Sequence, residues 1–161
     1  MKISKIANRH IIKHVSLLVL LKSKKRDNPR IMTLILCEIY FTNFFKRQLE
    51  YVAWILLTLI NSKRRLRLSI GIGQVQVKHW IDHEFISDEI LFQNLKQIIN
   101  PLVNYDLVKE IVESELNYGS IKLLSKFRGE ARLYHLKLFQ AIENRLNLLD
   151  SQLLHLRQCV K

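Results

Sequence analysis

The sequence predicts a mainly α-helical protein with one short β-hairpin or extended loop near residues 66–77. Glycine and proline, which turn-rich β folds need in quantity, number only four and two among 161 residues. Apolar residues recur at helical spacing through most of the chain, and alternation of apolar and polar residues is confined to Leu68 to Val77. A chain of this length with 48% hydrophobic residues is expected to form one domain with a substantial core.

We divide the chain into a basic N-terminal segment, residues 1–27, and a helical domain, residues 28–161. Residues 3–21 carry apolar side chains near one face and predict one basic amphipathic helix. Its apolar centre is too short to span a bilayer, and no small-residue cleavage site follows, so the segment is not a clean signal peptide. The compartment therefore stays open.

The formal net charge of +12 predicts an anionic partner. Nine Lys or Arg residues and a single Asp lie within residues 1–30. Such a charge suits nucleic acid, a polyanionic cell-wall polymer, or an anionic membrane surface contacted through residues 2–26. A solvated basic face without any partner accounts for the same composition.

In the first half of the domain, the Asn28-Pro29 pair opens a helix that is apolar nearly all round and therefore buried. Because no Gly or Pro occurs from Arg30 to Asn61, one long helix or two abutting helices are expected there, with the polar residues Lys46-Arg47-Gln48 as a break before the second apolar run. A short helix is expected from Lys78 to His83.

In the second half, Asn100-Pro101 separates two helices, and the second closes at Tyr118-Gly119. A short helix is predicted over residues 120–127. The last helix is long, with apolar residues at spacings of three and four from Leu136 to Leu156.

Two features suggest a functional site. Two of the four glycines lie one residue apart in Ser69-Ile70-Gly71-Ile72-Gly73-Gln74, where they permit unusual backbone angles and close approach of a ligand. Glu38 interrupts the apolar run from Ile31 to Phe45. A carboxyl group in such surroundings is either paired with a basic residue or kept protonated. The second state is the one that a general acid for glycosidic cleavage requires.

Taken in order, these segments resemble the lysozyme-like superfamily, in its branch of soluble lytic transglycosylases and goose-type lysozymes. That family has a catalytic Glu near the end of a buried helix and then a Ser-x-Gly-x-x-Gln motif, which Ser69 to Gln74 matches. Asn100-Pro101 with Asn104 fits its next helix. Phe127-Arg128-Gly129, followed by Tyr134, stands where the family has Tyr-Asn-Gly and a later Tyr.

The resemblance implies cleavage of peptidoglycan glycan strands in the cell wall or periplasm, with Glu38 as the single general acid/base and no cofactor or metal. Glu38 would protonate the leaving oxygen and then act as base while the sugar's own 6-hydroxyl attacks, which leaves a 1,6-anhydro product. Glu50 is expected to lie about 18 Å from Glu38 on an uninterrupted helix, too far for a second catalytic carboxylate. The implied substrate-binding residues are Ser69, Gly71, Gln74, Tyr134 and Arg128.

Other interpretations of the same residues stay open. Ser69 to Gln74 also fits a β-turn with a solvated Gln74, and Tyr134 fits ordinary helix packing. His79 and His83 have the spacing of two metal ligands, but no third ligand is evident, so no metal site is expected.

The alternative functions are a basic helical nucleic-acid-binding protein and a non-catalytic lysozyme-like interaction module. For the first, Lys63-Arg64-Arg65 would contact phosphates, and residues 73–80 faintly suggest a turn and recognition helix.

Overall fold

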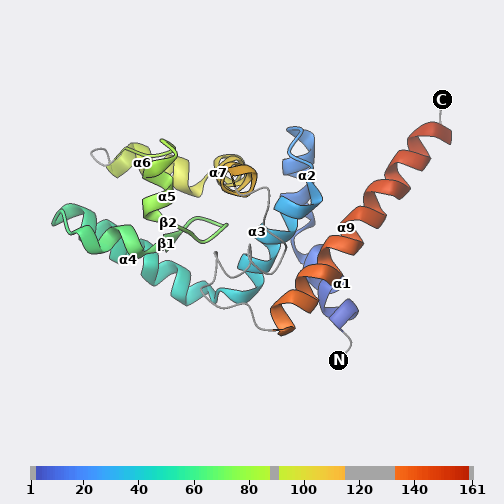
Figure 1. Ribbon diagram of the computed structural model, residues 1–161, viewed down its shortest axis with the longest axis horizontal. Coiled ribbons are helices and arrows are strands. Elements are labelled where there is room, and N and C mark those ends of the chain that lie inside the picture. The colour runs from blue at the N-terminus through green and yellow to red at the C-terminus, as the bar shows by residue number, and fades with distance from the viewer. Residues whose placement is uncertain (1–2, 88–90, 115–132, 160–161) are drawn as a thin grey trace.

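The computed structural model describes residues 3–87, 91–114 and 133–159 and confirms a mainly α-helical fold with one two-stranded antiparallel sheet (Figure 1). The predicted closure at Tyr118-Gly119, the predicted helix over 120–127, and Arg128 lie outside these ranges. The described elements are α1 (Ile3–Lys13), α2 (Val15–Ser23), α3 (Pro29–Phe41), α4 (Phe44–Leu59), the 3₁₀ helix η1 (Lys63–Arg67), β1 (Ser69–Ile70), β2 (Val75–Gln76), α5 (Val77–Asp82), α6 (Leu91–Ile99), α7 (Pro101–Ser114) and α9 (Leu133–Cys159).

The N-terminal segment forms two helices and not the single helix expected over residues 3–21. The boundary is a kink at His14, through which helical hydrogen bonding continues: the His14 N–H donates to the carbonyl of His10, and the Leu18 N–H donates to that of His14. The kink lets α1 contact α3 and α9 while α2 contacts α7. Ala7, Ile11 and Leu21 are consequently buried in the same core as the rest of the chain.

Helix α3 begins as predicted and forms the centre of the core. The Asn28 side chain accepts hydrogen bonds from the backbone N–H groups of Arg30 and Ile31, and Pro29 occupies the first turn, where its missing N–H is no loss. Every residue from Ile31 to Glu38 is buried, and α3 contacts α1, α7 and α9. The buried helix expected from the apolar run is thus confirmed.

The break after α3 lies at Thr42-Asn43, so the boundary predicted at residues 46–48 is wrong. The Asn43 side chain accepts a hydrogen bond from the Phe45 N–H at 3.1 Å and starts α4 there. Lys46, Arg47 and Gln48 are consequently inside α4. No helix in the described ranges is both long and apolar enough to cross a membrane.

The hairpin lies within the predicted residues 66–77. Ser69 pairs with Gln76 and Ile70 with Val75, which leaves residues 71–74 as the turn. Strand β1 contacts α4, and β2 contacts α5. In Figure 1 the turn points away from α5 toward α3.

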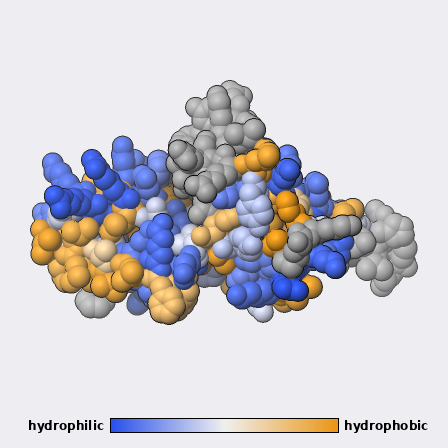
Figure 2. Space-filling model, turned by 90° about the horizontal axis from the view of Figure 1, so that it is seen from below, coloured by the Kyte–Doolittle hydropathy of each residue, from blue (hydrophilic) through white to orange (hydrophobic). Residues whose placement is uncertain are grey.

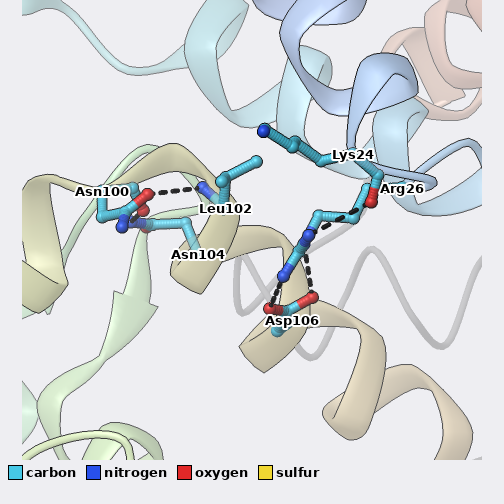
Figure 3. Close-up of polar contacts among 6 residues, drawn as sticks. All are labelled: Lys24, Arg26, Asn100, Leu102, Asn104 and Asp106. Carbon is cyan, nitrogen blue, oxygen red and sulfur yellow. Dashed lines mark hydrogen bonds and ion pairs between the residues drawn. The ribbon is translucent and has the colours of Figure 1, made fainter.

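Polar contacts tie the N-terminal segment and α6 to α7 (Figure 3). The Arg26 guanidinium donates two hydrogen bonds to the Asp106 carboxylate, at 2.8 and 2.5 Å. Asn100 caps α7 by accepting from the Leu102 N–H, as the Asn-Pro signal predicted. The Asn104 amide donates to the carbonyls of Ile98 and Asn100 and so fixes the angle between α6 and α7.

Candidate functional site

Glu38 lies in the last turn of α3 with only 3% of its surface exposed. Its backbone carbonyl accepts the Thr42 N–H that closes the helix. The neighbouring residues Leu34, Ile35 and Cys37 are fully buried and apolar. The expected burial of this carboxyl group at a helix end is therefore present.

Arg47, on the first turns of α4, is a basic group that interacts electrostatically with Glu38. Burial lowers the pKa of the Arg47 guanidinium, and electrostatic interactions with Tyr51, Glu38 and Glu50 oppose that effect. The Nε and Nη2 atoms of Arg47 are buried and make no hydrogen bond within the described residues. A buried guanidinium with open donors is ready to bind an anionic or carbonyl oxygen.

Glu50 lies on the same helix as Arg47, three residues further along the chain. The separation of about 18 Å assumed one uninterrupted helix, but Glu38 and Glu50 lie on different helices that meet at Thr42-Asn43, and both interact electrostatically with Arg47. Burial raises the pKa of the Glu50 carboxyl, and nearby Lys46, 3.7 Å away, opposes the rise. The site therefore has a second carboxyl group that the sequence had excluded.

The glycine turn is built against α7, as the geometry around its glycines shows. Gly71 has a φ of +79°, and a Cβ added to it would lie 2.1 Å from Asn104 Oδ1 and 2.8 Å from Trp80 Cζ2. A Cβ on Gly73 would lie 2.8 Å from Val108 Cγ2. Both glycines are thus required for close approach to neighbouring side chains, and Trp80 is buried in the core.

Gln74 holds the turn together. It is 5% exposed, has a φ of +49°, and donates a hydrogen bond from Nε2 to the Gly71 carbonyl at 3.1 Å. The plain β-turn interpretation required a solvated Gln74 side chain, but this side chain is buried. One of its amide N–H donors is already used inside the turn. Ser69 is half-buried and pairs with Gln76 in the hairpin.

Tyr51 connects the turn to the charged residues of α4. Its hydroxyl accepts a hydrogen bond from the Gly71 N–H at 3.1 Å, and burial raises the pKa of its phenol. Arg47 acts electrostatically on the same phenol. A continuous series of interactions therefore runs from Glu38 through Arg47 and Tyr51 to Gly71.

Tyr134, at the start of α9, lies beside the end of α3. Its hydroxyl is 3.2 Å from that of Tyr40, and its ring is 6.2 Å from that of Phe41. It is 40% exposed, so the hydroxyl is accessible to a ligand. Arg128, the other residue expected from this part of the chain, lies outside the described ranges.

A basic cavity of about 620 Å³ opens between α1, the end of α3 and the start of α4. Among the described residues no acidic side chain lines it, and Arg47 belongs both to its wall and to the surroundings of Glu38. Burial lowers the pKa of both His10 and His14, and the nearby Lys13 lowers them further. The described basic and histidine residues of its lining are Arg9, His10, Lys13, His14 and Arg47.

The sequence did not single out Arg47, Tyr51 or the cavity. Arg47 carried a weak signal, because it is a charged residue near the start of a mostly apolar helix. Tyr51 carried none, since its role depends on the hairpin folding back onto α4.

His79 and His83 have ring centres 6.4 Å apart, and His83 Nδ1 is 3.1 Å from Glu110 Oε2. The described residues contain no group of three or more potential metal ligands.

Comparison with protein-family models, with curated proteins and with solved structures found no match to this chain.

Proposed function

We propose that this protein cleaves the glycan strands of peptidoglycan, with Glu38 as the single general acid/base. The observation that carries the proposal is the burial of Glu38 at the end of α3, in electrostatic contact with Arg47 and linked through Tyr51 to the glycine turn. An acid placed beside a rigid backbone turn is what protonation of a glycosidic oxygen needs.

The surroundings of Glu38 suit both halves of the reaction. Burial among apolar residues favours the protonated carboxyl, which must donate its proton to the leaving oxygen. The Arg47 guanidinium favours the carboxylate that remains, which then accepts the proton of the sugar's 6-hydroxyl as that oxygen attacks the anomeric carbon. The glycosidic bond breaks, a 1,6-anhydro ring forms, and Glu38 regains its proton.

The remaining residues have supporting roles in this proposal. The glycine turn, held by Tyr51 and Gln74 and packed on Asn104, forms one wall of the sugar site in this proposal, with half-buried Ser69 at its edge. Tyr134 presents an exposed hydroxyl beside the end of α3, and Arg128 is proposed to join it at the substrate. Arg9 and Lys13 of the basic cavity offer charge to the carboxylates that peptidoglycan carries.

Digestion of purified peptidoglycan tests this proposal. The variant Glu38→Gln keeps the shape of the side chain and removes the proton, so soluble fragments should fall at least a hundredfold. Glu113→Gln, an exposed position on α7, is the matched control and should release fragments at the wild-type rate. Failure of the wild type to release fragments, or full activity of Glu38→Gln, would refute the assignment.

Glu50→Gln and product masses decide the mechanism. A single-acid transglycosylase keeps its activity in Glu50→Gln and releases products with the mass of the anhydro ring. If Glu50→Gln loses activity and the wild type releases products heavier by one water than the anhydro products, the protein is a hydrolase that uses two carboxyl groups.

The same preparation separates the alternative functions. Of the three residues expected to contact phosphates, Lys63 and Arg64 are exposed on η1, whereas Arg65 is buried and donates to Asn61 Oδ1 at 3.0 Å. Arg67, on the same 3₁₀ helix, is exposed and adds a further positive charge. Tight DNA or RNA binding that weakens steeply with salt, without wall cleavage, would favour that class. Binding to peptidoglycan without cleavage would favour the non-catalytic interaction module.

A further inference from the structure

Helix α4 presents an apolar face to solvent that the core does not use. Its members are each between 53% and 74% exposed and lie four, three, four and three positions apart, so they form one stripe along the helix. Figure 2 shows hydrophobic atoms gathered at the left end of the molecule, where α4 lies in Figure 1, with hydrophilic atoms around them. We call Phe45, Leu49, Val52, Leu56 and Leu59 the α4 apolar face.

The opposite side of α4 already anchors the helix to the protein. Trp54 is fully buried there, and Tyr51 and Ile55 pack against the core. Helix α4 is therefore apolar on both sides from residue 51 onward. A helix of this kind is normally covered on both sides, and an exposed stripe of large side chains marks a surface that binds something.

The charges around the stripe identify the partner. Lys46 stands exposed near its first turn, 3.7 Å from Glu50, and Lys63, Arg64 and Arg67 are exposed just beyond its last turn. Cationic residues at the edge of an apolar helical face match a bilayer, where the apolar side chains enter the acyl region and the cations meet anionic headgroups. A second copy of this chain is a poor occupant, because each copy carries +12.

We propose that α4 docks onto an anionic lipid surface, lying in the plane of the interface with the α4 apolar face among the acyl chains. This places the membrane contact on α4 in place of residues 2–26, where Ala7, Ile11 and Leu21 face the core but Ile12, Val15 and Val19 are exposed. The proposal does not depend on any activity of Glu38. Its consequence for the molecule is that Arg47 and Tyr51, on the same helix, lie close to the lipid surface.

Co-sedimentation of the full-length protein with vesicles tests the docking. The vesicles contain either phosphatidylcholine alone or equal parts of phosphatidylcholine and phosphatidylglycerol. The wild type should bind the anionic vesicles at least tenfold more tightly, and the difference should shrink as salt is raised. Equal binding to both compositions, or no binding, would overturn the proposal.

Paired variants locate the contact. Leu49→Gln/Leu56→Gln should weaken binding to the anionic vesicles at least tenfold, since two large side chains lose their affinity for the acyl region. Leu133→Gln/Leu148→Gln replaces two equally exposed leucines of α9 and should bind as the wild type does. Val15→Gln/Val19→Gln tests the N-terminal segment. Undiminished binding by the α4 variant, or a loss confined to the Val15/Val19 variant, would show that α4 is not the contact.

A second measurement guards against variants that misfold. A spin label on Leu49→Cys, in a chain with Cys159→Ser, should become inaccessible to a water-soluble relaxation agent when anionic vesicles are added. The same label on Leu148→Cys should stay accessible. If labelled Leu49→Cys is instead shielded without lipid, and sedimentation equilibrium shows a dimer, a second copy of the chain covers the face and the lipid proposal fails.

Discussion

Asn104 Oδ1 fills the space that a side chain on Gly71 would need. A Cβ added to Gly71 would lie 2.1 Å from that oxygen, and the φ of +79° is itself unfavourable for any residue with a Cβ. The Asn104 amide is held in place by the carbonyls of Ile98 and Asn100 and cannot simply turn away. The hairpin turn and the α6–α7 junction are thus one structural unit.

This relationship predicts the effect of adding a methyl group at Gly71. Gly71→Ala should lower the free energy of unfolding by about 3 kcal/mol, the sum of backbone strain and overpacking. A Cβ at position 73 would come close to a methyl group of Val108, at 2.8 Å, and Gly73 has no positive φ. Gly73→Ala should therefore lower the free energy of unfolding by less. Urea denaturation measures both.

The contact between Gly71 and Asn104 is then isolated by a double-mutant cycle. Asn104→Ala removes the colliding oxygen, so the double variant should be more stable than the two single losses predict, by about 1 kcal/mol. Additive losses would mean that the strain lies in the backbone angle or against Trp80.

The hydrogen bond from the Gly71 N–H to Tyr51 predicts a second effect. Tyr51→Phe leaves a buried N–H without its acceptor and should lower the free energy of unfolding by about 1–2 kcal/mol. Hydrogen exchange at the Gly71 amide should accelerate in the folded state. Tyr40→Phe removes a hydroxyl from the exposed pair with Tyr134 and serves as the control, with a loss below about 0.5 kcal/mol. An equal loss in both variants would contradict the link between α4 and the turn.

The lowered pKa values of His10 and His14 predict a dependence of stability on pH. Both groups have an ordinary pKa of 6.5, and burial lowers it in the folded protein, so the unfolded chain binds protons first as pH falls. The contribution of these two groups to the free energy of unfolding should be fully present above pH 6.5 and should decline as the pH falls below it. Each unit of lowering contributes about 1.4 kcal/mol.

The double variant His10→Gln/His14→Gln checks the origin of this slope. Gln at position 10 keeps a donor for the Leu36 carbonyl, which His10 Nε2 contacts at 2.8 Å, but does not titrate. Urea denaturation between pH 5 and pH 8 should give a flatter profile for the variant than for the wild type. Subtracting the two profiles removes the contribution of Glu50, whose raised pKa acts in the opposite direction. Parallel profiles would place the slope on other groups.

The packing of α1 and α2 predicts that residues 28–161 do not fold alone. Removing residues 1–27 takes buried Ala7, Ile11, Leu18 and Leu21 from the core and exposes the surfaces of α3 and α9 beneath them. Circular dichroism should show no cooperative thermal transition in the truncated chain. The control is Arg26→Ala in the full chain. It breaks the half-exposed pair with Asp106 and an exposed hydrogen bond to the Lys24 carbonyl, and should cost about 0.5–1 kcal/mol. A cooperative transition in the truncated protein would show that the segment is dispensable.

Local signals in the sequence determined the class of fold and several boundaries. Asn28-Pro29 and Asn100-Pro101 start helices where predicted, because a cap acts on backbone groups only a few residues away. The alternation around Gly71 placed the hairpin, and the apolar run indicated that Glu38 is buried. The break at Asn43 carried the same kind of cap, but the charges at residues 46–48 were the more conspicuous signal and proved misleading.

The tertiary structure alone decided how these pieces meet. Helix α3 ends and α4 begins at Thr42-Asn43, and Arg47 of α4 interacts electrostatically with Glu38 of α3, while the folding of the hairpin onto α4 joins Tyr51 to Gly71. Gly71 and Gly73 are needed because of side chains on α5 and α7. Apolar periodicity shows that a helix has a face to bury, but not which neighbour buries it. The exposed side of α4 could therefore be recognised only once the opposite side had been seen in the core.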